Sequence, residues 1–167
     1  MKQSFGTIGV SVAALGAMAL FAMQSGHAAP KPTKGEMEVD YRQSLYTVLG
    51  GNFGPLGAMA EGKVPFNAAE ARVRAHRVAF LAPMLKEAFP ADSDGADHTA
   101  AKHEIWTDPD EFAKKLQTLI DRTAALATAA DTGDADKIKD AIEETGKACK
   151  SCHEKFRKKD EDIGGPA

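Results

Sequence analysis

Apolar side chains recur along the second half of the chain at alternating intervals of four and three residues, which places them on one face of an α-helix. Asp108, Pro109 and Glu111 open the first such segment in the order expected of a helix start, and it runs to about residue 130. Asp134 is the expected cap of the next helix. The two predicted seams comprise Phe112, Leu116, Leu119, Thr123 and Leu126, and then Ile138, Ile142, Thr145, Cys149, Cys152 and Phe156.

Two further helices are predicted before these. The first spans about residues 36–61, with glycines and Pro55 expected to kink its middle. The second begins at the cap Asn67 and runs to about residue 89, with Pro83 as an irregularity. Residues 91–107 form a polar linker. The predicted inward residues are Tyr41, Leu45, Val48, Leu49 and Leu56 in the first helix and Val73, His76, Phe80 and Met84 in the second.

Four helices with short or moderate connections predict an all-α fold, an antiparallel, left-handed four-helix bundle. Aromatic residues make up only 7% of the chain, too few for a β-sandwich or barrel. The net charge of −3 offers no basic excess for nucleic acid. Small residues along the last helix would leave the core underpacked, so a large apolar insert is expected there.

The first 28 residues have the layout of a secretory signal peptide: Lys2, an uncharged apolar run over 5–23, and small residues at 26 and 28. A transmembrane anchor is the competing interpretation, because the run approaches the roughly 20 residues that span a bilayer. The glycines and other small residues favour cleavage. We therefore expect residues 1–28 to be removed, 29–35 to form a flexible leader, 36–160 to form the folded domain and 161–167 to form a flexible tail. The mature chain is expected in the periplasm without a membrane anchor.

The sequence Cys149-Lys150-Ser151-Cys152-His153 is a CxxCH motif, typical of covalent attachment of a c-type haem. On a helix its three functional side chains emerge from one face within about one 5.4 Å turn. A zinc site needs four protein ligands, and the chain has no second cysteine pair. A redox dithiol belongs at the start of a helix that follows a strand. The motif therefore predicts one haem c.

The remaining histidines and methionines of the mature chain are the candidate sixth ligands of the iron. A strong sixth ligand would make an electron carrier, whereas a vacant position would make a gas-binding site. None of the candidates is compelling, because the histidines fall in the polar linker or beside arginines and the methionines fall near helix ends. These residues are His76, His98, His103, Met37, Met59 and Met84.

In its helices and its motif the chain resembles cytochrome c′, a four-helix-bundle c-type cytochrome, over residues 36–159. Five short segments carry the resemblance: Tyr-Arg-Gln-Ser at 41–44, Asn-Phe-Gly at 52–54, Pro-Phe at 65–66, Glu-Ile-Trp at 104–106, and the CxxCH motif with Phe-Arg-Lys-Lys at 156–159. The resemblance implies that Cys149 and Cys152 carry the thioether bonds and that His153 is the proximal iron ligand.

The same resemblance assigns four more residues to the cofactor site. Tyr46 takes the place over the distal face where related low-spin proteins have a ligating Met, so the iron is expected to be five-coordinate. Arg42 resembles the family's arginine near a haem propionate, and Gln43 lies beside it in the matching segment. Arg157, four residues after His153, can reach the proximal side.

These residues predict a haem protein, not an enzyme, that binds nitric oxide or carbon monoxide and protects the exporting cell from nitric oxide. The alternative is a periplasmic one-electron carrier. The lysine run at 155–159 is expected to be a solvated helix end and could dock a redox partner. The first helix carries more apolar residues than one core stripe requires, which predicts a two-fold homodimer through the first and second helices.

Overall fold

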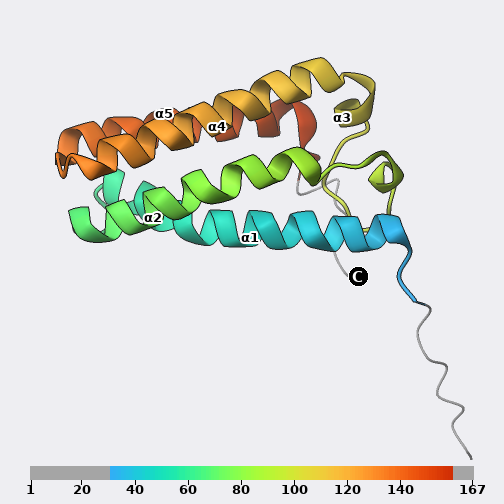
Figure 1. The fold of residues 1–167 in the computed structure, drawn as a ribbon, viewed down its shortest axis with the longest axis horizontal. Coiled ribbons are helices and arrows are strands. Elements are labelled where there is room, and N and C mark those ends of the chain that lie inside the picture. The colour runs from blue at the N-terminus through green and yellow to red at the C-terminus, as the bar shows by residue number, and fades with distance from the viewer. Residues whose placement is uncertain (1–30, 160–167) are drawn as a thin grey trace, which may run out of the picture. The chain divides into compact units, whose positions relative to one another are not determined.

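The computed structural model describes residues 31–159, so the expected signal peptide and the tail 161–167 lie outside the described residues. Four long helices form the structure: α1 (Lys34–Ala60), α2 (Ala68–Leu81), α4 (Pro109–Asp131) and α5 (Ala135–Phe156). They run in alternating directions (Figure 1). Within residues 31–159 the only strand-like feature is an isolated bridge between Ala101 and Arg157. The predicted all-α, antiparallel four-helix bundle is confirmed.

None of the helices in this part of the chain has the length and apolar character needed to cross a bilayer.

Helix α1 contains Pro55 and is nevertheless continuous. A proline inside a helix has no N–H to donate, so the carbonyl four residues earlier loses its partner. That carbonyl belongs to Gly51, and Nη1 of Arg74 on α2 donates to it at 3.2 Å. A side chain of the neighbouring helix thus replaces the missing backbone hydrogen bond. At its start α1 has a capping box between Thr33 and Glu36.

The predicted second helix is divided at its proline. Asn67 caps it as expected, accepting from the backbone N–H of Glu70. Helix α2 ends at Leu81, and a 3₁₀ segment, η1 (Ala82–Glu87), follows with Pro83 in its first turn. The linker then holds two short elements, η2 (Ala91–Ser93) and α3 (Glu104–Thr107). Gly35 lies so close to η2 that a side chain there would overlap the carbonyl oxygen of Asp92.

The seams predicted for α4 and α5 are confirmed, with the two cysteines half-buried and the other members buried. The seam predicted for α2 is wrong: Val73, His76 and Phe80 are exposed, and its buried positions are Ala71, Ala75 and Val78. In α1, Tyr41 and Val48 are also exposed. Alanine on the inner face lets α2 lie close to its neighbours, so its larger apolar side chains point outward.

The core consists of two clusters at opposite ends of the bundle. One lies toward the α1–α2 and α4–α5 turns and includes Leu56, Val78, Leu126 and Ile138. The other lies toward the opposite end and combines aliphatic residues with Phe112 and Phe156; Cys149 and Cys152 pack against it. The three-residue connection between α4 and α5 turns at Gly133, whose φ of 69° is in the region that favours glycine.

Candidate haem site

The CxxCH motif lies in the last two turns of α5. Cys149 and Cys152 are half-buried free thiols, and His153 lies at the helix surface. Burial raises the pKa of Cys149 to about 11 and also raises the pKa of Cys152, so both thiols are protonated at neutral pH. Partial desolvation, together with the charge of Arg157, lowers the pKa of His153. A neutral imidazole is the form that ligates a metal.

Aromatic rings form a wall in the cluster against which the two cysteines pack. Phe89, between η1 and η2, lies at the centre of this group. Its ring centroid is 4.9 Å from that of Phe112 on α4 and 6.4 Å from that of Trp106 on α3, both in edge-to-face geometry. Phe112 in turn lies 5.3 Å from Phe156 on α5. Three helices and the segment between η1 and η2 therefore supply a continuous apolar surface in this cluster.

Tyr46 lies near the motif, on helix α1, which packs beside α5. Its ring packs edge-to-face against Phe89, with the centroids 6.4 Å apart. Burial raises the pKa of the Tyr46 phenol well above its ordinary value, and its proximity to Cys152 and Cys149 adds to the shift. The phenol is therefore neutral and lies near both thiols.

The methionines and other histidines lie away from this cluster in the part of the chain that the structure describes. Met59 belongs to the core cluster toward the helix turns, Met37 is exposed, and half-buried Met84 lies outside the aromatic cluster. Besides His153, residues 31–159 contain three histidines, all exposed; His76 contacts Asp131, His103 contacts Asp94, and the carbonyl of His98 accepts from Gln43.

Arg42, one turn before Tyr46, is buried, with only 3% of its surface exposed. Its Nη1 donates to the carbonyl of Ala88 at 3.3 Å and to Oγ of Ser93 at 2.9 Å, and its Nη2 donates to Oγ1 of Thr99 at 2.9 Å. Among residues 31–159 no carboxylate forms an ion pair with it. Burial lowers the pKa of this guanidinium, and a buried cation of this kind is suited to an incoming anion.

Gln43 and Arg157 lie at the edge of the site. Gln43 is exposed, and its Nε2 donates to the carbonyl of His98 at 2.7 Å, which holds the linker against α1. Arg157 is exposed, ends α5 and pairs with the linker at Ala101. The structure thus packs Cys149, Cys152, Tyr46 and Phe89 against the same cluster. Ser93 and Thr99, which hold Arg42, are additional residues that sequence reasoning missed, since their role depends on the path of an irregular loop.

The donor set fits a c-type haem. Two thiols and one imidazole on a single turn of helix can supply two covalent bonds and one axial nitrogen. The aromatic wall suits a flat apolar group, and Arg42 suits its acidic substituents. No group of three or more His, Cys, Asp or Glu side chains arranged to hold a metal ion occurs among residues 31–159.

Comparison with known proteins gives a consistent grouping. The family model described as Cytochrome C' matches residues 37–157. A cytochrome c' from Rubrivivax gelatinosus is 40% identical over 127 residues, which cover 72% of this chain and 94% of that protein. The solved structure of cytochrome c prime from Shewanella frigidimarina is 40% identical, with a TM-score of 0.72 over 77% of this chain and 100% of the other. The nitric oxide complex of a point mutant of cytochrome c prime from Alcaligenes xylosoxidans is 35% identical, with a TM-score of 0.69 over the same shares.

Proposed function

This chain belongs to the cytochrome c′ family of haem c proteins, and from that membership we propose that it is an exported, non-enzymatic haem protein that binds nitric oxide or carbon monoxide. Its physiological role would be to bind nitric oxide and so protect the cell. When bound, the haem iron supplies an axial position for a diatomic ligand. The chain's own residues hold the cofactor and control access to that position.

Each residue of the site has a proposed task. Cys149 and Cys152 provide the thioether bonds, and His153 provides the axial nitrogen. Arg42 pairs with a propionate while Ser93 and Thr99 keep its guanidinium in place, and Gln43 keeps the linker closed over α1. Arg157 raises the positive potential on the proximal side, in keeping with its effect on the pKa of His153.

One observation supports gas binding above all others: the polar α1 side chain that lies near both cysteines is that of Tyr46, a neutral phenol. A strong-field sixth ligand in this class is a thioether or an imidazole. The methionines and other histidines of the described chain lie elsewhere. A protonated phenol is a poor iron ligand, so Tyr46 would leave a coordination position of the iron for an exogenous molecule. The Alcaligenes xylosoxidans relative crystallised with nitric oxide supports the same ligand class.

The optical spectrum of the reduced protein tests this function. We expect a high-spin ferrous spectrum that carbon monoxide converts to a low-spin form. Tyr46→Met should give a low-spin spectrum even without carbon monoxide, because a thioether is a competent haem ligand. Tyr41→Met is the matched control, since Tyr41 is exposed and its hydroxyl donates to Glu87. A wild-type ferrous spectrum that is already low-spin and unchanged by carbon monoxide would contradict the proposal and favour a one-electron carrier.

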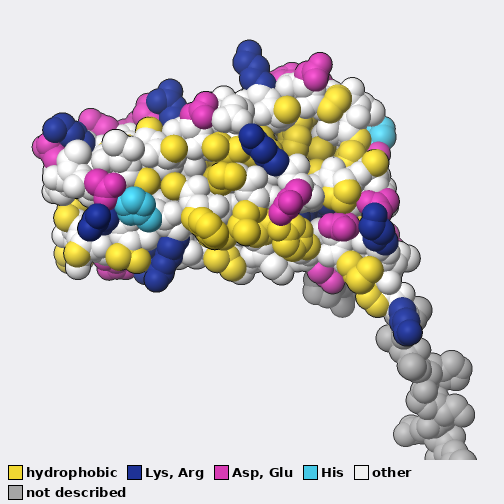
Figure 2. All heavy atoms as spheres, viewed as in Figure 1, with side chains coloured by type: hydrophobic (Ala, Val, Ile, Leu, Met, Phe, Trp, Pro, Cys, Tyr) yellow, Lys and Arg dark blue, Asp and Glu magenta, His cyan; other side chains and the backbone are white. Residues whose placement is uncertain are grey.

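We further propose that the protein forms a homodimer through α1 and α2. Figure 2 shows apolar side chains gathered over the middle of these helices. Val48 on α1 is 51% exposed, and Val73 and Phe80 on α2 are 50% and 72% exposed. Phe80→Asp should convert a dimer to a monomer in sedimentation at tens of micromolar, whereas Val64→Asp, in the turn beyond α1, should not. A wild-type monomer under these conditions would refute the dimer.

The proposed location is the periplasm, and it rests on the sequence of residues 1–28. The mass of the purified mature protein tests it, because cleavage after Ala28 and one haem give a defined mass. A mass that retains residues 1–28 would contradict this location.

A further inference from the structure

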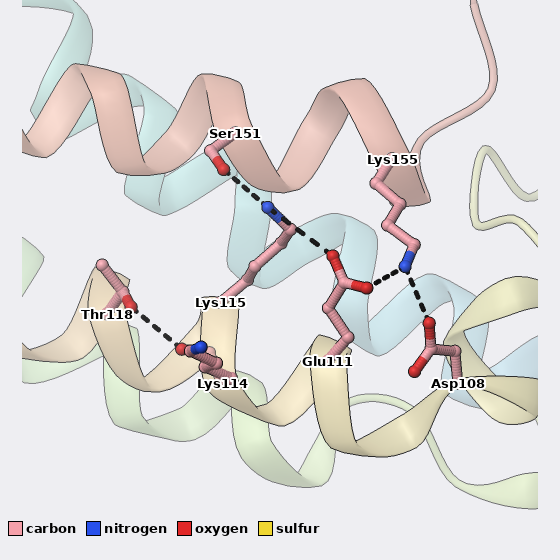
Figure 3. Close-up of polar contacts among 7 residues, drawn as sticks. All are labelled: Asp108, Glu111, Lys114, Lys115, Thr118, Ser151 and Lys155. Atoms are coloured by element: carbon pink, nitrogen blue, oxygen red, sulfur yellow. Dashed lines mark hydrogen bonds and ion pairs between the residues drawn. The ribbon is translucent and has the colours of Figure 1, made fainter.

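A chain of polar contacts joins the first turns of α4 to the last turns of α5 (Figure 3). Nζ of Lys155 donates to Oδ2 of Asp108 at 2.7 Å and also contacts Oε2 of Glu111. The other oxygen of Glu111 lies 4.0 Å from Nζ of Lys115. That ammonium group donates to Oγ of Ser151 at 2.7 Å. We refer to these five residues as the α4–α5 clamp.

The clamp contacts α5 two residues before and two residues after the proposed iron ligand, His153. Ser151 and Lys155 are four residues apart and share one face of the helix. His153 is two residues from each, and at about 100° per residue two steps lead to roughly the opposite face. The clamp therefore fixes the helix from the side that faces away from the imidazole.

The position of Lys155 gives these contacts a geometric role. Ion pairs that solvent reaches add little to global stability, and the Lys155 side chain is 35% exposed. Lys155 is, however, in the last turn of α5, which ends at Phe156. Asp108, at the start of α4, makes no capping hydrogen bond with its side chain. Its carboxylate instead holds Lys155, so the contact constrains where the last turn of α5 sits.

We propose that Lys155 is a positioning residue that, through Asp108 and Glu111, fixes the last turn of α5 and with it the imidazole of His153. This inference rests on the proposed function only in taking His153 as the axial ligand of the iron. This end of α5 is also held by buried Phe156, whose ring packs on Phe112, and by backbone hydrogen bonds between the linker and residues 156–158. These contacts lie at and beyond residue 156, so without the clamp the polar side of the turn at 151–155 has more freedom to shift on α4. A shifted turn would displace the His153 imidazole and so weaken the bond that it would make to the iron.

The test compares three variants of the holoprotein. Lys155→Gln removes the charge, and Lys155→Arg restores it with a side chain that can bind both carboxylates. Lys150→Gln is the matched control, because Lys150 is on the same helix but pairs only within it, with Glu154 at 3.8 Å. For each we would record the iron–imidazole stretching band of the ferrous protein by resonance Raman spectroscopy, the reduction potential, and native-state hydrogen exchange of residues 151–156.

We expect Lys155→Gln to lower the frequency of the iron–imidazole band, shift the potential and speed exchange at 151–156 by about fivefold. Lys155→Arg should return all three toward wild type, and Lys150→Gln should leave them unchanged. Asp108→Asn combined with Lys155→Gln should add little to the single change, because both remove the same contact. A Lys155→Gln variant with the wild-type band, potential and exchange would overturn the inference. If the wild-type iron is six-coordinate, the gas-binding function fails, while the potentials and exchange rates of the same variants still decide the role of Lys155.

Discussion

The ring of Tyr46 should act as a shield that an incoming ligand must displace. In the structure it packs against Phe89 with a centroid distance of 6.4 Å. An edge-to-face pair of this kind is worth about 0.5–1.5 kcal/mol beyond the burial of its area. At about 1.4 kcal/mol per factor of ten, losing that pair on ligand entry weakens carbon monoxide binding by about twofold to tenfold. Tyr46→Ala should therefore tighten binding by about that factor and accelerate association.

The assay is carbon monoxide association and dissociation on the ferrous holoprotein, measured by flash photolysis and ligand replacement. Tyr46→Phe keeps the ring and removes the hydroxyl, so shielding predicts near wild-type rates. Tyr41→Ala controls for the general loss of a tyrosine from α1. Because Tyr46 is half-buried, Tyr46→Ala should also lower the free energy of unfolding by about 2 kcal/mol. Weaker binding in both Tyr46→Ala and Tyr46→Phe would refute shielding and show that the hydroxyl assists the ligand.

Three further predictions concern attachment, α1 and pH. The double change Cys149→Ala and Cys152→Ala should release all haem into acid acetone and leave a poorly folded protein; covalent haem in this variant would contradict the assignment. Arg74→Met should lower the free energy of unfolding by about 1 kcal/mol, because the Gly51 carbonyl loses its donor, whereas exposed Arg77→Met should not. A hydrogen bond with Asp94 raises the pKa of His103 above its ordinary 6.5. This pair therefore stabilises the protein below pH 6.5 and is lost as the pH rises through the higher folded-state pKa. In His103→Gln the free energy of unfolding should fall less as the pH rises above 6.5. An unchanged dependence on pH would contradict a stabilising role for the His103–Asp94 contact.

The C-terminal half of the fold could be predicted because its inward residues are large. Leu116, Leu119 and Ile138 recur at helical spacing, and spacing alone identifies their face. In α2 the inward residues are alanines while Val73 and Phe80 point outward, so a pattern based on the largest apolar side chains selects the wrong face. Periodicity reports that a helix is amphipathic, but it does not say which of two apolar faces another helix will cover.

In the candidate haem site, too, some residues can be predicted from the sequence and others cannot. The CxxCH residues are close in sequence, so helix geometry alone brings them together. The partners of Arg42 are 46 to 57 residues away and lie on or next to an irregular linker, where no periodicity operates. Asp108 was correctly predicted as the residue before α4, but its side chain binds Lys155 instead of capping the helix. Lys155 itself was expected at a solvated helix end and is instead held by two carboxylates.

The lengths of the connections imply an order of folding. At one end of the bundle, α1 and α2 are joined through residues 61–67 and α4 and α5 through 132–134, so each helical hairpin closes a short loop at small entropic cost. The end that carries the CxxCH motif is held by Arg42 reaching Thr99 across 57 residues and by the pairing of Ala101 with Arg157. Closing such long loops is slower and depends on prior collapse. The two hairpins should therefore form first, and the linker that holds Arg42 and pairs with Arg157 should close last.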